Sequence, residues 1–481
     1  MAKRGRKPKA LPVVERKAFV IQRARAINAG YDAAQTTNHN KKHWERASAL
    51  SADGEADAAT RKELRNRARE EVRNNSYARG IVLTLANDIV GTGPRLQMLS
   101  DDTELNSGIE AAFYQWCRDT SFFEKLRTMR MARVQDGEAF GMLVSNPNSP
   151  NAVKLDIQLI EAEQVASETA KPPTNDVDGV LLDAFGNPTQ YSVTKNHPGD
   201  GTGGKAAYMK VPASGMIHSY RVDRPGQHRG IPEITPALGL FAQLRRFTMA
   251  VLTAAETAAD FAAVLYTRNP ADGAAPNDDP FGSIELDRNM MMSLPDGWEM
   301  SQFKAEQPQT TYADFKREIL NEIARCLNMP YNVAACNSSG YNYSSATMDH
   351  EIYQKSIRVE QTTDEYKILD RVFSMWLAEY ALLPDAPAID AMIIPPHKWY
   401  WDGVRKLDPI KAATAQQMRL ANNTSTFADE CAADGKDWEE VFAQRARENE
   451  RMKELGLTAP DITPEPVNEA PAGQEENANE E

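Results

Sequence analysis

The chain has 481 residues and a formal net charge of −13. Its length suffices for about three domains, and its 41% hydrophobic and 26% charged residues are ordinary for a globular protein. The acidic balance argues against a protein whose whole surface binds nucleic acid, although it allows one that lets nucleic acid pass. No apolar run approaches the roughly 18 residues that a membrane span needs, so we expect no membrane contact.

The two ends of the chain are polar and predict no packed structure. Residues 1–40 include a basic arm with no apolar stretch behind it, so we expect no secretory signal. The arm is either a solvated tail or a transient contact for nucleic acid or an acidic partner. Residues 458–481 are rich in proline, glutamate and asparagine and predict an acidic, disordered tail. Four cysteines without metal or disulfide spacing fit synthesis in a reducing compartment.

Residues 41–235 predict a mixed region in which helices come first and strands follow. Within 41–90 and 104–133, apolar residues recur at helical spacing. Later segments alternate apolar and polar residues or pair across glycine turns, which predicts a small antiparallel sheet. Its strands are expected at 138–144, 154–160, 179–193 and 216–220. The expected fold class is therefore α+β.

The segment from Arg224 to Thr267 organises the rest of the chain. It opens with a polar elbow, residues 224–230, and Pro232 and Pro236 then fix φ at the start of a helix. From about Leu238 apolar residues recur at helical spacing among many alanines, so we expect one helix of about 30 residues and about 45 Å. This helix is either a buried core helix or a wall element in a ring of subunits.

The second half of the chain predicts a β module followed by helices. Between the long helix and the next one, short extended segments are expected at 283–286, 290–294 and 298–303. An amphipathic helix runs from about Tyr312 to Leu327. A polar loop of small residues over 333–345 separates it from another long helix that ends near Leu382, and residues 407–450 are again helical.

No segment supplies a convincing catalytic, metal or cofactor site. Residues 199–206 nearly match a phosphate-binding loop, but Ala206 replaces the hydroxyl that would hold Mg²⁺, and a strand rather than a helix is expected next. His39 and His43 are four residues apart but lack the glutamate of a zinc protease motif. Residues 349–351 (Asp-His-Glu) are adjacent, which places them on different helix faces and favours solvated surface. We therefore expect no enzyme.

Four stretches, 73–97, 224–238, 321–346 and 408–448, carry a resemblance to a known family. In their residues and their order, they resemble tailed-phage portal proteins of the lambda family. The resemblance implies a ring, usually of twelve copies, at one five-fold vertex of a capsid, with double-stranded DNA passing through a central channel. It also implies that the protein itself hydrolyses no nucleotide, because a separate terminase supplies that activity.

The resemblance further implies the division of the chain that the family shares. The wing would comprise 41–235 and, as a return helix and strand, 348–400. The stem would be two helices, 236–267 and 310–328, with the clip at 268–309 between them. The tunnel loop region would lie at 329–347 and the crown at 401–457, between a disordered arm, 1–40, and a disordered tail, 458–481.

Candidate DNA-facing positions follow from this division. They lie in the tunnel loop, the stem and the clip: Asn337, Ser338, Ser339, Tyr341, Asn342, Lys304, Lys316 and Arg317. A channel that bound every phosphate tightly would have to break those contacts at each step, so a few basic or amide contacts suit passage better. Candidate subunit-interface positions lie in the elbow and the first stem helix: Arg224, Gln227, Arg229, Phe247 and Phe261.

The partners that the resemblance implies are further copies of the chain, DNA, the terminase large subunit, a head–tail adaptor, and the major capsid and scaffolding proteins. The protein would be made in the host cytoplasm and would reside in the virion. Two other classes remain open on the residues alone. A nucleotide-hydrolysing packaging motor or nuclease would need a complete phosphate loop or clustered carboxylates, and a capsid shell or scaffold protein would form no isolated ring with a pore.

Overall fold

The computed structural model describes residues 37–38, 40–45, 47–200, 207–260, 264–267, 298–301, 309–384, 386–387, 394–403 and 408–457. The chain divides into two compact units, Met1–Ser51 and Ala52–Glu481. The described part of the first unit contains turns but no helix, so the helical prediction is wrong for 41–45 and 47–51. All that follows concerns the second unit, in which no described helix is both long and apolar enough to span a membrane.

The second unit opens with helices that are capped by side chains. They are α1 (Ala52–Glu55), α2 (Ala58–Asn74), α3 (Ser76–Val90), α4 (Thr103–Asp119) and α5 (Phe122–Asp136). Asp57 caps α2 by accepting a hydrogen bond from the Thr60 amide (2.8 Å). Asn75 caps α3 by accepting from the Tyr77 amide (3.0 Å). The helices expected over 52–90 and 104–133 are thus confirmed, the first range as α1, α2 and α3 and the second as α4 and α5.

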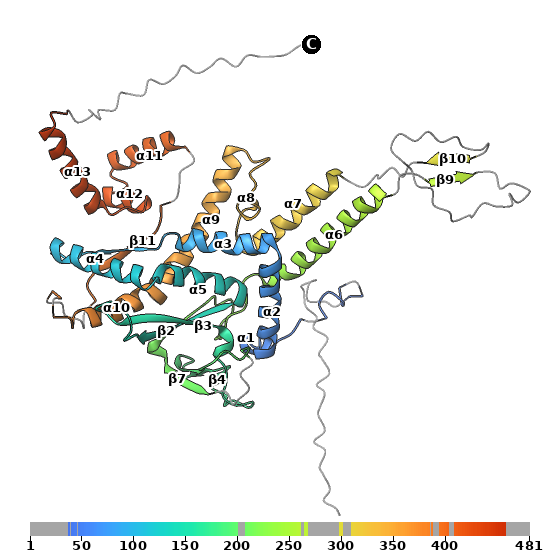
Figure 1. The fold of residues 1–481 in the computed structure, drawn as a ribbon, viewed down its shortest axis with the longest axis horizontal. Helices are drawn as coiled ribbons and strands as arrows, with labels where there is room; N and C mark the ends of the chain where they lie inside the picture. The colour runs from blue at the N-terminus through green and yellow to red at the C-terminus, as the bar shows by residue number, and fades with distance from the viewer. Residues whose placement is uncertain are drawn as a thin grey trace, which may run out of the picture. The chain divides into compact units, whose positions relative to one another are not determined.

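Two antiparallel sheets follow these helices, where the sequence predicted one. The first sheet has the order β3-β2-β8 and the second the order β4-β5-β6-β7. Their strands are β2 (Glu138–Ser145), β3 (Leu155–Ile160), β4 (Asp176–Val177), β5 (Val180–Leu182), β6 (Pro188–Thr194), β7 (Tyr208–Pro212) and β8 (Met216–Tyr220). Short 3₁₀ turns, Ala162–Gln164 and Ala213–Gly215, join them. The α+β class is confirmed (Figure 1).

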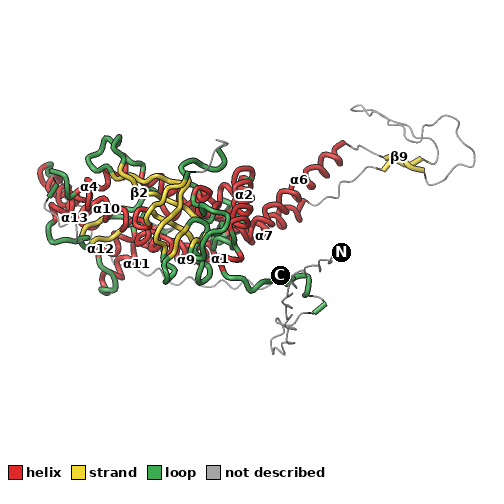
Figure 2. Tube along the Cα trace, turned by 90° about the horizontal axis from the view of Figure 1, so that it is seen from below, coloured by secondary structure: helices red, strands yellow, loops and turns green. Residues whose placement is uncertain are grey.

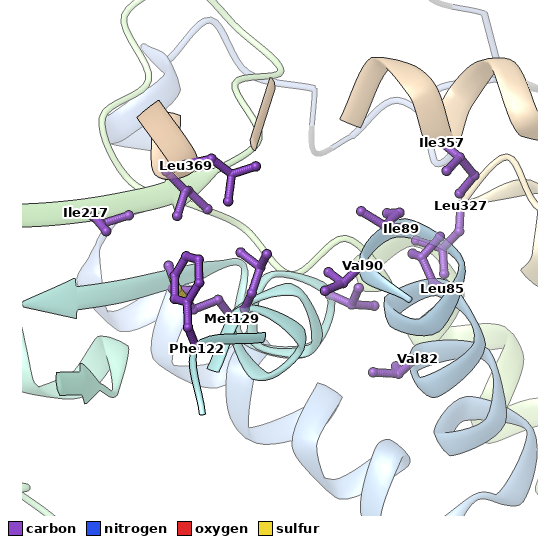
Figure 3. Packing of buried hydrophobic residues seen from close by; sticks show 14 of the residues in the cluster. Val82, Leu85, Ile89, Val90, Phe122, Met129, Ile217, Leu327, Ile357 and Leu369 are labelled. Carbon is purple, nitrogen blue, oxygen red and sulfur yellow. The ribbon is translucent and has the colours of Figure 1, made fainter. Parts of the chain in front are cut away.

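The main hydrophobic core lies between α3, α5 and the helices of the second half. Figure 3 shows Leu85 and Ile89 of α3 close to Leu327 and Ile357, while Phe122 and Met129 of α5 lie near Ile217 and Leu369. An aromatic cluster extends the core, with Phe113 packed edge-on against Phe373 and Trp376 (ring centroids 5.4 and 5.1 Å apart). Segments far apart in sequence therefore share one core.

Helices α6 (Leu238–Asp260) and α7 (Gln309–Arg325) run side by side (Figures 1 and 2). A 3₁₀ turn, Thr235–Ala237, precedes α6. The prediction that the first helix reaches Thr267 is wrong, because β9 (Val264–Thr267) pairs antiparallel with β10 (Trp298–Ser301). The sequence of β9, Val-Leu-Tyr-Thr, has high β propensity, which outweighed the helical spacing. The strands expected at 283–286 and 290–294 lie outside the described residues.

The helix predicted to end near Leu382 is continuous but not uniform. It begins after a short helix, α8 (Tyr331–Ala334), and consists of α9 (Tyr343–Asp364), a π-helical turn (Glu365–Leu369) and α10 (Asp370–Tyr380). The Asp370 amide donates to the Glu365 carbonyl, the i to i+5 bond that defines a π turn. Strand β11 (His397–Tyr400) then pairs with β1 (Arg95–Met98), far away in sequence.

The C-terminal helices α11 (Pro409–Ala421), α12 (Phe427–Ala433) and α13 (Trp438–Glu454) form the last described part. The connection into them is fixed to the end of α3, because Asp402 accepts hydrogen bonds from the amide and hydroxyl of Thr92 (both 2.6 Å). Gly403 and Gly435 lie backbone to backbone, since a Cβ on either would overlap the other segment. This part of the chain is therefore docked on the helical core.

Candidate functional site

The loop between α8 and α9, residues 335–342, is the polar segment that the sequence singled out. It is narrower than the predicted 329–347 because both ends are helical. Asn337, Ser338, Ser339 and Asn342 are exposed, whereas Tyr341 is half-buried. The Asn337 side chain accepts from the Ser339 amide (2.9 Å), which shapes the tip of the loop.

Both ends of this loop are anchored. Asn342 caps α9 by accepting from the Ser345 amide (2.9 Å). On the other side, the side chain of the buried Asn332 bonds His350 (3.0 Å). The sequence predicted solvated surface at 349–351, and this is wrong for His350, which is half-buried. Its spacing of three from the buried Tyr353 was the available signal, because residues i and i+3 share a helix face.

The loop also carries an exposed thiol, Cys336. Cys117 and Cys431 are buried, and the half-buried Cys326 donates its thiol to the Glu233 carbonyl (3.1 Å). Since the structure describes each of the chain's four cysteines, Cys336 is the thiol that a bulky reagent can reach. The native chain thus contains a chemical handle within its candidate DNA-facing loop.

The charged candidates on α7 have partners within the chain. The Lys316 ammonium lies 5.0 Å from the ring centre of Tyr77 on α3 and 5.8 Å from that of Tyr312, a cation–π arrangement. Arg317 is exposed and pairs with Asp314 (3.1 Å) and Glu318 (3.5 Å). Lys316 therefore also fastens α7 to α3, and the charge of Arg317 is locally balanced. Lys304 lies outside the described residues.

Of the interface candidates in the elbow, only Arg224 lies on the surface, where it pairs with Glu55. Gln227 is buried: its side-chain oxygen accepts from the Asp223 amide (2.9 Å) and its nitrogen donates to the Arg229 carbonyl (2.9 Å). It therefore folds the elbow back on itself. Its polar atoms are thus used inside the chain rather than at a surface.

Arg229 is likewise an internal residue, with 1% of its surface exposed. Its Nη2 lies 2.6 Å from Oε1 of Glu138 and its Nε 2.9 Å from Oε2. His218 and Arg65 also reach this carboxylate, at 3.1 and 3.4 Å. Burial alone would raise the pKa of Glu138, but Arg229 and His218 outweigh it and hold that pKa well below its usual range. Arg229 cannot meet a second subunit from this position.

A second buried ionic cluster joins Glu233, which lies just after the elbow, to α5 and α9. Glu233 receives both terminal nitrogens of Arg130 (3.0 and 2.8 Å) and one from Arg133 (3.2 Å). Arg133 also bonds Glu360 on α9 (2.8 Å) and lies 3.6 Å from Asp364. Burial opposes ionisation of Glu233, yet Arg130 and Arg133 lower its pKa to about 2. For Asp364 burial wins and raises the pKa to about 6.

Phe247, the other described interface candidate, packs within the chain. Its ring centre lies 4.4 Å from that of Phe315 and 5.8 Å from that of Tyr312, both on α7. It is half-buried there, so its main role is to hold α6 and α7 together. Phe261 lies outside the described residues.

A groove of about 730 Å³ lies between α2, α3, α5 and the ends of β2 and β3. At its rim, Glu161, Glu163 and His197 bring ligand atoms within 4.8 Å of one another. Arg69 lies 3.1 Å from both carboxylates, so their charge is already compensated and a cation would compete with a guanidinium. The groove therefore offers no metal site built for the purpose.

Comparison with known proteins gives a consistent result. Residues 37–361 match the family model of the phage portal protein, lambda family. A "Probable portal protein" of Halomonas phage phiHAP-1 is 25% identical over 450 residues, which cover 85% of this chain and 84% of that protein. Portal protein B of Escherichia phage lambda is 21% identical over 470 residues, or 82% of this chain and 84% of that protein.

Among solved structures, a chain from the neck of an empty GTA particle is 14% identical, with a TM-score of 0.47 over 77% of this chain and 93% of that one. The family model covers more than half of the chain, and the predicted resemblance is confirmed. Proteins of this family are structural components of the virion rather than enzymes. The chain therefore belongs to the lambda family of phage portal proteins.

Proposed function

We propose that twelve copies of this chain form a ring at one capsid vertex, and that double-stranded DNA enters and leaves the capsid through its central channel. The observation that carries the proposal is the loop at 335–342, which combines exposed neutral polar side chains with two anchored ends. Amide and hydroxyl groups contact phosphates without releasing many counterions, so DNA could slide past them. The family membership supports the ring.

In this proposal each part of the fold has one place in the ring. The wing comprises 41–235 and 348–400, and the stem is α6 with α7. The clip is the chain between the stem helices, 268–309, together with β9, and the crown is 401–457. The loop at 335–342 would face the channel.

The same proposal assigns the partners. The clip would bind the terminase large subunit during packaging and then a head–tail adaptor. The major capsid and scaffolding proteins would surround the wing during assembly, after synthesis in the host cytoplasm. Nucleotide hydrolysis would belong to the terminase, so the purified chain should show no ATPase activity. Turnover of ATP by the chain alone would favour the packaging-motor class instead.

Negative-stain images of the purified full-length chain test the ring directly. We expect closed rings with a central pore wide enough for a DNA duplex of about 20 Å. A compact monomer, or a shell without isolated rings, would contradict the proposal. A shell without isolated rings would favour a capsid shell or scaffold protein.

Cys336 allows a test of the channel without any substitution. A maleimide-linked polyethylene glycol placed on Cys336 of assembled rings should reduce the DNA packaged per particle, because the polymer would occupy the channel. The matched control is Cys336→Ser treated with the same reagent, which should package normally. Normal packaging by the fully labelled wild type would show that this loop does not line the path of the DNA.

Single substitutions test the remaining candidates. Each of eight single substitutions should change the amount of DNA packaged per particle if the side chain touches DNA. They are Asn337→Ala, Ser338→Ala, Ser339→Ala, Tyr341→Phe, Asn342→Ala, Lys304→Gln, Lys316→Gln and Arg317→Gln. Lys316→Arg separates two roles, since a guanidinium keeps the cation–π contact with Tyr77. Unchanged packaging across the whole set would refute the assignment of these positions.

A further inference from the structure

Helix α9 has two apolar faces, one of which is uncovered. Tyr353 and Ile357 are 2% and 3% exposed and lie in the core. Met348, Ile352 and Val359 are 65%, 59% and 60% exposed, and their spacing of four and seven places them together on the opposite face. We name Met348, Ile352, Lys355 and Val359 the α9 stripe. Three large apolar side chains in a row mark an interaction surface more often than isolated ones do.

Lys355 restricts what can cover the α9 stripe. It is exposed between Ile352 and Val359, and it has no ion-pair partner within the part of the chain that the structure describes. A partner that covers the stripe must supply a carboxylate, because a buried unpaired ammonium is costly. Two copies packed through the same stripe about a two-fold axis would bring Lys355 near its own copy. The stripe therefore suits a different, acidic surface.

The chain displays such a surface on α6 and α7. Met249 and Leu252 of α6 are 60% and 52% exposed, and Phe315 of α7 is 45% exposed. Glu318 and Glu322 follow Phe315 at spacings of three and seven, so they share its helix face, and both are exposed. Met249 and Leu252, three residues apart, share one face of α6, and Phe315, Glu318 and Glu322 share one face of α7; we name these five residues together the α6–α7 face. It combines apolar side chains with carboxylates and is thus complementary to the α9 stripe.

Both surfaces adjoin the loop proposed to line the channel, since α7 and α9 flank it. In a twelvefold ring, neighbouring copies at a radius of about 20 Å are about 10 Å apart, which is the distance between the axes of packed helices. Helices close to the channel must then pack on helices of the next copy. A closed ring of this kind uses two unlike surfaces on each subunit.

We infer that the α9 stripe of one copy packs against the α6–α7 face of the next copy, with Lys355 opposite Glu322. This inference rests on the ring of the proposed function. It identifies the surfaces that close the ring, and the side of each helix that is buried by assembly.

Photocrosslinking in the full-length chain tests the contact. With p-benzoylphenylalanine in place of Ile352, illumination of assembled rings should give a ladder of covalent multimers whose crosslinks map to the α6–α7 face. The same residue in place of Phe185, an exposed residue between β5 and β6, should give no ladder. Rings that yield no ladder from position 352, or crosslinks to another surface, would overturn the inference while leaving the proposed ring intact. Absence of wild-type rings would overturn both.

Charge reversal gives a second, independent test. Lys355→Glu should lower the apparent association constant at least tenfold in sedimentation experiments, and Glu322→Lys should do the same. The double variant should recover most of the loss, because the pair is restored with its charges exchanged. Phe185→Glu serves as the control for a surface change, and far-UV circular dichroism confirms folding. Single variants that assemble like the wild type, or a double variant no better than either single one, would overturn the pairing.

Discussion

Arg229 and Glu138 form a bidentate ion pair at the start of the central strand of the first sheet, with Nη2 to Oε1 and Nε to Oε2 distances of 2.6 and 2.9 Å. Glu138 begins β2, and Arg229 belongs to the elbow that leads into α6. Since both side chains are about 1% exposed, neither charge can turn to water when its partner is lost. The pair therefore locks the entry of α6 to the sheet.

Arg229→Ala should destabilise the chain by about 3–5 kcal/mol, because it leaves Glu138 buried and under-compensated. The matched control is Arg224→Ala, which removes an exposed pair with Glu55 and should cost no more than about 1 kcal/mol. Urea unfolding followed by tryptophan fluorescence measures both. Equal losses of unfolding free energy in the two variants would show that burial does not determine how much each ion pair contributes to stability.

Asp364 should make stability depend on pH in an unusual direction. Burial raises its pKa to about 6, above the roughly 3.9 of an unfolded aspartate. The native state therefore holds the proton more tightly than the unfolded chain, so this residue's contribution to stability falls as pH rises from about 4 through 6. Asp364→Asn should remove that loss and raise the free energy of unfolding by on the order of 1–3 kcal/mol at pH 7.5.

Glu233→Gln is the control for Asp364→Asn, because the pKa of Glu233 is shifted in the opposite direction. Its pKa is lowered to about 2 by Arg130 and Arg133 against the effect of burial, so the ionised carboxylate contributes stability above pH 4.5 and loses it as pH falls towards 2. The variant should be less stable than the wild type at neutral pH. Urea midpoints at several pH values compare the two variants, and a wild-type slope that persists in Asp364→Asn would contradict the assignment.

Gly230→Ala should damage the fold although it adds only a methyl group. A Cβ at Gly230 would overlap the backbone carbonyl of Gly137, which turns α5 into β2 with a φ of 92°. Because backbone cannot move aside as a side chain can, we expect a loss of about 1–3 kcal/mol. Gly239→Ala is the control: nothing lies near its Cβ position, and the change should stabilise α6 by up to about 1 kcal/mol. Thermal unfolding midpoints that move the same way would refute this contrast.

Ionisation of Glu110 on α4 should make the stability of the C-terminal helices depend on pH. Burial raises its pKa, the hydrogen bond from the Met98 amide opposes this, and the nearby Asp437, Glu440 and Glu439 add to it, so that the pKa is about 7. A raised carboxyl pKa means that stability falls as pH rises from about 4.5 through 7. Glu110→Gln should therefore increase hydrogen-exchange protection of α13 at pH 8. Glu104→Gln, an exposed change on the same helix, should leave that protection unchanged.

The sequence predicted the elements that depend on local patterns. Apolar spacing located α3 and α7, and alternation located β3, because both signals lie within a few residues. The ionic clusters carry no such signal: Arg133 and Glu360 are 227 positions apart. Glycine and proline surround Arg229, a composition typical of exposed turns, so its local sequence carries no signal of burial. The polar loop was found because its composition is itself the local signal, whereas the bond between Asn332 and His350 depends on packing.

The π-helical turn at Glu365–Leu369 sets the angular phase between two helices. Each residue of an α-helix advances the chain by roughly 100°, so the wider turn rotates everything after it relative to a straight helix. With this rotation α9 directs Tyr353 and Ile357 into the core while α10 directs Phe373 and Trp376 there. Closing this turn to regular α geometry with all its residues kept would swing Trp376 by about 100° out of its aromatic cluster, whereas deleting one residue would give an uninterrupted helix that keeps Trp376 on the core side. The wider turn thus accommodates one extra residue while both helices keep their apolar faces on the core.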